Sequence, residues 1–454
     1  MPSTFLRPLA HCAMRSHRFP GVSKLAFSTQ GAQPGSIYRS KTFLAGAILL
    51  IGAPLGFSYG KSYSNLPETL SKKKLGDLYG GSLDWKGKAL PPCTMKDVEA
   101  WLVKEQSIHQ GMASSGVREW HCSRHASNTP GEDELVTSRV KIPRSFGEGS
   151  QPWMFWGVFD GHVVLTQNYM LEVEQHHYFS ENPLVQYVSR SLSQLFQSPP
   201  GVQGISKIER EKAIVDAIKA AFNQLDDEII SDAVDALKTA KTTTETLSRL
   251  APGLAGACAI LSMYDPNSNL LRNYVTTPLS IDQTGLNKLE AARIKAEHPD
   301  EKMIVNEKSG RTLGMAPSRT FGDGVWKPRD PKLYLTPPYL TAEPVVTTTN
   351  IERKGEFMII ATDGLWDCMS NEQAVKLVEM WLQAKKDGNF NVQPKKSEGG
   401  RYFVLDDNCA THLVRNALGG ADEEVLCAIV GAAPSFSRSA RDDITVQVVF
   451  FDDE

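Results

Sequence analysis

Three short acidic motifs in the sequence share one arrangement, in which carboxylates stand next to an apolar run. Asp160 and Asp363 each follow such a run and are each followed by glycine, whereas Asp442 and Asp443 directly precede one. Carboxylates, a backbone carbonyl and water are the ligands that Mg²⁺ and Mn²⁺ prefer. Because converging carboxylates repel one another without a countercharge, a divalent cation is their natural occupant. A glycine after the aspartate also lets a backbone carbonyl, here that of Gly161, come close to the ion.

Two divalent ions that share one of these carboxylates can hold a hydroxide between them. Such a centre supplies a nucleophile at neutral pH and neutralises the charge on a phosphoryl oxygen. His162, two residues after Asp160, is placed to protonate a leaving oxygen. Each motif alone has a simpler interpretation: a turn for Asp-Gly, a solvated strand cap for the acidic pair, a surface or core side chain for the histidine. Their combination favours a hydrolytic metal centre.

The runs beside these motifs are rich in β-branched and aromatic residues, which is typical of strands. Strands are expected at Phe155–Phe159, Phe357–Thr362 and Ile444–Phe451. Each acidic motif then lies at the end of a strand, where the backbone is rigid and side chains can converge while facing solvent. Helical periodicity is found around Ile208–Ile230, Gly285–Glu297 and Asn371–Ala384, and a polar loop is expected over Lys385–Arg401. Strands and helices do not alternate regularly, which favours an α+β fold with antiparallel sheet over a doubly wound fold.

The first 60 residues differ in composition from the rest of the chain. They contain no Asp or Glu but six Lys and Arg residues and several serines, which is typical of a mitochondrial transit peptide. Within them, residues 43–59 form a short uncharged hydrophobic segment, shorter than the ~20 residues of a full membrane span and interrupted by Pro54. It is interpreted as an inner-membrane anchor or as part of the sorting signal. Residues 61–94 are polar and glycine-rich and are predicted to be a linker, and the folded domain is expected over residues 95–454.

The overall composition is that of a globular protein. Of 454 residues, 22% are charged and 41% hydrophobic, and the net charge is −3, which argues against a chain built to grip nucleic acid. The cysteines are seven, widely spaced and without a Cys-x-x-Cys motif, so we expect reduced thiols rather than disulfides or a zinc site.

Six ordered motifs give the chain a family resemblance. They are SNTPGED (127–133), VFDGH (158–162), LAGACA (254–259), MAPSRTFGD (315–323), IIATDGLWD (359–367) and RDDITV (441–446), with PLSIDQTG (278–285) in addition. In this order they resemble the metal-dependent protein phosphatases of type 2C, over roughly residues 95–454. The transit-like N-terminus is similar to that of the mitochondrial branch, which includes pyruvate dehydrogenase phosphatase.

The resemblance implies a fold and a set of roles. The fold is a central antiparallel β-sandwich with helices on both faces (four layers, αββα), with the metals in a cleft at one edge. Asp160 would bridge two Mg²⁺ or Mn²⁺ ions, Gly161 would supply a carbonyl, and Asp363 and Asp442 would each bind metal. Asp133, with Glu132, would hold metal-bound water. His162 would be the general acid, and Asp443 stands where the family often has asparagine. Arg319 and Asp323 would be structural or flap-associated residues.

Two departures from the family pattern leave two hypotheses open. Val163 and Val164 follow His162 where the family has small residues, and β-branched residues do not readily adopt the positive φ that glycine permits. Between Asp265 and Pro278 the sequence lacks a Thr-Gly-Asp-Ser-Arg motif with its two strands, so ladder groups of a neighbouring strand would lose their partners. The first hypothesis is an active metal-dependent serine/threonine phosphatase that hydrolyses phosphoproteins by a metal-activated hydroxide, with the phosphorylated E1 component of pyruvate dehydrogenase as a candidate substrate. The second is a catalytically impaired relative that binds phosphoproteins or regulates a partner.

Overall fold

The computed structural model describes most of the chain from residue 93 onward. The described residues are 93–113, 115–127, 131–142, 152–162, 183–197, 206–266, 277–301, 303–327, 336, 338–349, 351, 356–390, 404–432, 437–438 and 440–452. The predicted transit peptide (1–60), its hydrophobic segment (43–59) and the linker up to residue 92 lie outside them. So do Val163 and Val164 and most of the shortened segment before Pro278.

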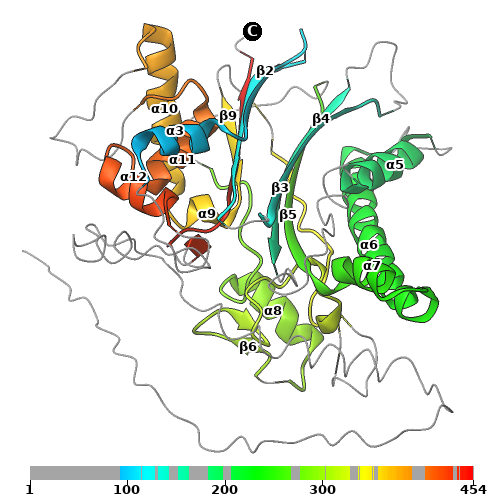
Figure 1. Ribbon diagram of the computed structural model, residues 1–454. Coiled ribbons are helices and arrows are strands. Elements are labelled where there is room, and N and C mark those ends of the chain that lie inside the picture. Colours follow the sequence, from blue (N-terminus) through cyan, green and yellow to red (C-terminus); the bar gives the residue numbers. More distant parts are fainter. Residues whose placement is uncertain are drawn as a thin grey trace, which may run out of the picture. The chain divides into compact units, whose positions relative to one another are not determined.

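Two four-stranded antiparallel sheets form the centre of the fold (Figure 1). The first sheet has the order β1-β2-β10-β9, with β1 Gln106–Gln110, β2 Val117–His125, β10 Ile444–Phe451 and β9 Phe357–Ala361. The second has the order β3-β4-β5-β8, with β3 Asp133–Val140, β4 Trp153–His162, β5 Gly256–Tyr264 and β8 Phe321–Gly322. A separate two-stranded ribbon pairs β6 Val305–Asn306 with β7 Arg311–Thr312.

Helices cover the outer face of each sheet, which gives four layers (Figure 1). Beside the first sheet lie α3 Met95–Val103, α9 Asp363–Trp366, α10 Asn371–Asp387, α11 Cys409–Leu418 and α12 Glu423–Val430. Beside the second lie α5 Pro183–Gln197, α6 Lys207–Thr239 and α7 Thr243–Leu254. A further helix, α8 Lys288–Glu297, and a 3₁₀ turn, η1 Gly324–Trp326, belong to the segment that follows the second sheet's β5. The predicted α+β sandwich flanked by helices is confirmed.

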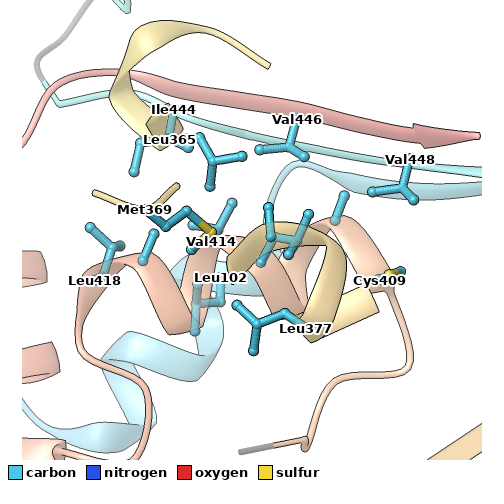
Figure 2. Packing of buried hydrophobic residues seen from close by; sticks show 14 of the residues in the cluster. Leu102, Leu365, Met369, Leu377, Cys409, Val414, Leu418, Ile444, Val446 and Val448 are labelled. Carbon is cyan, nitrogen blue, oxygen red and sulfur yellow. The ribbon is translucent and has the colours of Figure 1, made fainter. Parts of the chain in front are cut away.

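Three apolar clusters hold these layers together, and β10 takes part in two of them. Its side chains alternate in direction, as strand geometry requires: Val446 and Val448 face the helices, whereas Val449 packs between the sheets against residues such as Trp156. Figure 2 shows the helix-facing cluster, in which Val446 and Val448 lie above Leu377 and Val414 of α10 and α11. All eight residues of β10 are buried, so this strand forms a rigid support for the segment that precedes it.

The predicted strands and helices are found, and several are longer than expected. β4 continues through Asp160, Gly161 and His162, because both neighbouring strands go on pairing with it there. The prediction that Asp160 lies just past a strand is therefore wrong by three residues. Likewise, α10 continues to Asp387, into the predicted polar loop, and ends at Gly388 with φ of +64°, a conformation that favours glycine.

The shortened segment before Pro278 follows β5, so the loss of its two strands would show at the outer edge of β5. This strand pairs with β4 along its whole length, but with β8 only at Gly256 and Ala257. Within the described residues, the rest of this edge has no strand partner.

Among the described helices, none combines the length and the apolar character that a membrane span requires. The six cysteines among the described residues form no disulfide with one another.

Candidate functional site

Four segments that are far apart in the sequence bring carboxylates to one end of the sandwich. Asp133 begins β3 and lies directly opposite Asp160 of β4 in the ladder. Asp363 is the first residue of α9, immediately after β9, and Asp442 lies two residues before β10. Because β9 and β10 are antiparallel neighbours, the end of one and the start of the other meet at the same sheet edge. The structure thus brings together Asp133, Asp160, Asp363 and Asp442, which the sequence predicts as a group.

The electrostatics of this cluster, here called the carboxylate centre, are those of like charges held together in a buried place. Burial, followed by the charges of Asp363, Asp133 and Asp442, raises the pKa of Asp160 well above its usual value. Burial and neighbouring carboxylates also raise the pKa of Asp133 to about 8 and that of Asp363 to about 6. The hydrogen bond between the side chains of Asp160 and Asp363 acts in opposite directions, raising the pKa of Asp160 and lowering that of Asp363.

Asp442 has the same tendency but also a cationic neighbour. Burial raises its pKa, and Arg438 opposes this from 2.8 Å, measured from Nη1 to Oδ1. The same guanidinium contacts Glu132 through Nη2 at 3.0 Å. Arg438 therefore neutralises part of the rim of the centre. Its role is not evident from the sequence, because a single arginine four residues before an aspartate carries no motif.

Asp443 has a different role from its neighbour. Its Oδ1 accepts hydrogen bonds from the backbone N–H and the hydroxyl of Ser127, at 2.5 and 2.6 Å. Its Oδ2 accepts the backbone N–H groups of Glu132 and Asp133, at 2.5 and 3.2 Å. This buried carboxylate therefore links the segment before β3 to the segment before β10 and fixes the position of Asp133, the first residue of β3.

Thr362 connects the two sheets at the centre. Its hydroxyl donates to Oδ2 of Asp133 at 2.6 Å and accepts the backbone N–H of Thr445 at 3.0 Å. One side chain thus aligns β9, β10 and the start of β3. The prediction that Asp133 lies behind the other carboxylates is compatible with this contact, because the threonine already occupies one of its oxygens.

Two glycines of the motifs are required by close backbone approaches. A Cβ on Gly161 would stand 2.5 Å from the carbonyl oxygen of Glu132, and one on Gly364 would stand 1.9 Å from that of Asp443. Any larger residue would have to push backbone aside at the two places where β3 and β10 meet the site. The Asp-Gly pairs therefore serve packing as well as any chemistry.

His162 forms an ion pair that the sequence analysis did not anticipate. Its Nε2 lies 2.8 Å from Oδ2 of Asp323, whose side chain is 3% exposed. Burial lowers the pKa of His162, but the charge and hydrogen bond of Asp323 outweigh it, so that the pKa is raised overall. Asp323 adopts φ of +48°, and Gly256 makes room for the pair, since a Cβ there would lie 2.2 Å from both side chains. Asp323 is therefore more than the flap-associated residue that the resemblance implies.

The donors of the carboxylate centre fit a hard divalent cation. They are oxygen atoms whose mutual repulsion raises the pKa values of Asp160 and Asp363, and a cation beside them would relieve that repulsion. Within the described ranges, no three His, Cys, Asp or Glu side chains already surround a common point as metal ligands. Two nearby carboxylates, Asp133 and Asp443, are instead held by the hydrogen bonds described above.

Comparison with known proteins gives the family. The sequence profile of protein phosphatase 2C matches residues 132–418. A protein phosphatase 2C homolog of Schizosaccharomyces pombe is 34% identical over 382 residues, which cover 75% of this chain and 81% of the relative. The mitochondrial pyruvate dehydrogenase phosphatase 1 of Saccharomyces cerevisiae is 29% identical over 433 residues, covering 78% and 72%. The human mitochondrial pyruvate dehydrogenase phosphatase 2 is 33% identical over 245 residues, covering 44% and 45%. The chain belongs to the protein phosphatase 2C family of serine/threonine protein phosphatases.

Proposed function

We propose that this chain is a metal-dependent serine/threonine phosphatase whose reaction takes place at the carboxylate centre. The observation that carries the proposal is the convergence of Asp133, Asp160, Asp363 and Asp442, whose pKa values are all raised. A binding module without catalysis has no need to keep mutually repelling carboxylates buried together, because each costs stability. Membership of the protein phosphatase 2C family also favours an active enzyme over a catalytically impaired relative.

The proposed ligands of two Mg²⁺ or Mn²⁺ ions are Asp160, shared between them, the carbonyl of Gly161, Asp363 and Asp442. Asp133 would act from behind them, through water. When bound, such ions lower the pKa of water and neutralise phosphoryl charge. The chain's own residues orient this set: Thr362 and Asp443 fix the segments, and the glycines allow them to approach one another.

His162 is the proposed general acid for the leaving serine or threonine oxygen. Asp323 holds its ring and favours the protonated form, so that a proton is available near neutral pH. Its side chain is 17% exposed, so it faces the solvent side of the pair, where a substrate can reach it. Asp323 is accordingly proposed as a positioning residue for this histidine.

The proposed substrate is the phosphorylated E1 component of pyruvate dehydrogenase, and the proposed location is the mitochondrion. Support comes from the acid-free first 60 residues and from relatives that are named mitochondrial pyruvate dehydrogenase phosphatases. Attachment to the inner membrane through residues 43–59 is part of the proposal, and these residues lie outside the described ones. Either the matrix or the intermembrane space is compatible with this address.

The proposal is tested by phosphatase turnover of the purified full-length chain on a phosphothreonine peptide, with Mn²⁺ or with chelator. We expect turnover that needs the metal and disappears in Asp363→Asn, while Asp216→Asn on the exposed side of α6 behaves as wild type. A folded wild-type protein that shows no turnover with Mn²⁺ or Mg²⁺ would support the binding-module hypothesis instead. The substrate is tested by comparing kcat/KM on phosphorylated pyruvate dehydrogenase E1 with that on an unrelated phosphoprotein; equal values would refute this substrate.

A further inference from the structure

A cavity of about 250 Å³ lies beside the carboxylate centre and is not accounted for by the proposed reaction. It is enclosed by the C-terminal part of α3, the end of β2 and the segment that leads into β10. The lining side chains that matter here are Trp101, Lys104, Glu105, Arg124, His125 and Arg441. Ser127, whose hydroxyl and N–H hold Asp443, also lines it, so that the cavity and the centre share a wall.

The charges of this lining are not balanced. Three cationic side chains face one carboxylate, that of Glu105. Arg124 is paired twice, with Glu105 at 2.9 Å and with Glu134 at 2.7 Å. Glu105 thus has its strong contact with this arginine, whereas Lys104 stands 3.5 Å from it with 73% of its side chain exposed. Lys104 is therefore available to a ligand in the cavity.

Arg441 is the member with the least compensation. Its Nη1 donates to the backbone carbonyl of Ala126 at 2.6 Å, and its guanidinium lies over the ring of Trp101 at 4.7 Å. Its buried Nε has no hydrogen-bond partner. The carboxylate charges that act on it are those of Asp443 and Asp442, neither of which lines the cavity. An anion in the cavity would therefore offset part of the cost of burying this guanidinium.

His125 is neutral and therefore adds no positive charge to the cavity. Burial, followed by the charges of Arg441, Arg124 and Lys104, lowers its pKa to about 3. Its Nε2 is hydrogen-bonded to Ser123 at 2.7 Å, and its ring lies 4.2 Å from that of Trp101. The aromatic rings therefore form one wall of the cavity, and the cations supply its field.

We propose that this cavity binds an oxyanion, a phosphate or carboxylate group, with Arg441 and Lys104 as its charged ligands. Its volume is below the ~300–1,000 Å³ of pockets for drug-sized molecules, so it suits one small anionic group rather than a nucleotide. Charge-assisted hydrogen bonds from a guanidinium are the strongest that a phosphate or carboxylate can accept. Such a group can be carried by the phosphoprotein substrate next to the reacting residue, or it can be free inorganic phosphate.

Binding is tested first without metal, using inorganic phosphate as the probe and the full-length chain in chelator, by isothermal titration calorimetry. Without metal the carboxylate centre carries only one cation, Arg438, which is already paired with Glu132 and Asp442, so that the heat of phosphate binding reports on the cavity. We expect saturable binding that weakens at least ~5-fold in Lys104→Gln and in Arg441→Lys, because each removes or misplaces a charge-assisted bond. The matched control is Lys238→Gln on α6, a lysine that is 50% exposed and likewise contacts one carboxylate, that of Asp235.

Lys104 is so exposed that its substitution should leave the fold intact, which keeps the test decisive even if Arg441→Lys unfolds. Absence of phosphate binding by wild type, or binding unchanged in Lys104→Gln, would overturn the proposal. This arm does not depend on phosphatase activity. A second arm rests on the proposed function and identifies the source of the anion: KM for phosphothreonine peptides with and without an added acidic residue. A rise in KM in Lys104→Gln only for the acidic peptide assigns the cavity to the substrate. A weaker inhibition constant for phosphate, with both KM values unchanged, assigns it to free phosphate.

Discussion

Buried carboxylates in two regions of this molecule differ in how far the chain neutralises them. Glu290 on α8 is 3% exposed and is held by Arg293 at 2.5 Å, by Arg319 at 2.8 Å and by the hydroxyl of Ser318 at 2.7 Å. Burial alone would raise its pKa, but these hydrogen bonds lower it to about 2. In the carboxylate centre, burial and mutual repulsion raise the pKa of Asp160 and its neighbours, and Arg438 reaches only the rim.

The difference separates structural charge from functional charge. Where a carboxylate holds the fold, as Glu290 does, the chain supplies its cations and the site is complete. Where carboxylates are gathered without cations, the chain pays with stability, and the missing positive charge must come from outside. The following predictions test whether the two groups differ in this way.

The largest expected effect is the loss of activity on neutralising the shared ligand. Asp160→Asn should reduce Mn²⁺-dependent turnover about 10⁴-fold, or ~5 kcal/mol of transition-state stabilisation, because one side chain would serve both ions. In chelator the same variant should be at least as stable as wild type to urea, since a repelling charge is gone. Turnover and urea unfolding are the measurements. An active Asp160→Asn protein would refute the assignment of this residue.

Glu290→Gln should show the opposite combination. It leaves Arg319 without its carboxylate and Arg293 with only Glu297, which should destabilise the fold by about 3 kcal/mol with no direct effect on metal binding. The matched control is Glu297→Gln on the same helix, which breaks a half-exposed pair with Arg293 and should cost well under ~1 kcal/mol. Urea unfolding measures both. Equal changes in the two variants would contradict the structural role of Glu290.

His162 and Asp323 form a third arrangement, in which the chain supplies both charges. His162→Gln should reduce turnover of a phosphothreonine peptide about 10²-fold, and less for p-nitrophenyl phosphate, whose leaving group needs no proton. Asp323→Asn should move the high-pH limb of the kcat profile to lower pH, because the group that raises the pKa of His162 is weakened. If the high-pH limb of the kcat profile does not move in Asp323→Asn, the pair has only a packing role.

The smallest predicted effect is a pH dependence of the metal-free protein. The pKa of Asp363 is raised to about 6 in the folded chain, against 3.8 unfolded, so the folded state binds its proton more tightly. This group's contribution to stability is therefore present below pH ~4 and is lost as the pH rises through ~6. In chelator, Asp363→Asn should gain about 1 kcal/mol over wild type between pH 5 and pH 7.5. Urea unfolding at both values measures the gain; a difference of opposite sign would contradict the unneutralised centre.

How much of this could be predicted from the sequence depended on whether a feature was local. Asp160, Asp363 and Asp442 each carry a motif and adjoin an apolar strand, so their convergence could be inferred before the fold was known. The contact between His162 and Asp323 spans 161 residues and depends on the left-handed backbone of Asp323, which no spacing reveals. The paired environments of Thr362 and Asp443 likewise arise only where the two sheets meet.

Secondary structure shows the same limit. The β-branched and aromatic residues of Ile444–Phe451 were enough to predict β10, whereas the continuation of β4 through His162 depends on neighbours that pair with it. The cavity beside the centre was not predicted either, because Trp101, Arg124 and Arg441 come from three separate segments. The roles assigned to the carboxylates and to His162 stay predictions.

The central claim is that the carboxylate centre needs cations from outside the chain, whereas Arg293 and Arg319 already neutralise Glu290. The most direct test is a calorimetric titration of the metal-free full-length chain with Mn²⁺ at pH 7.5, on wild type, Asp160→Asn and Glu290→Gln. The account predicts two ions bound to wild type and to folded Glu290→Gln, and affinity weakened at least ~100-fold in Asp160→Asn. A folded wild-type chain that binds no Mn²⁺, or an Asp160→Asn variant that binds it as wild type does, would contradict the account.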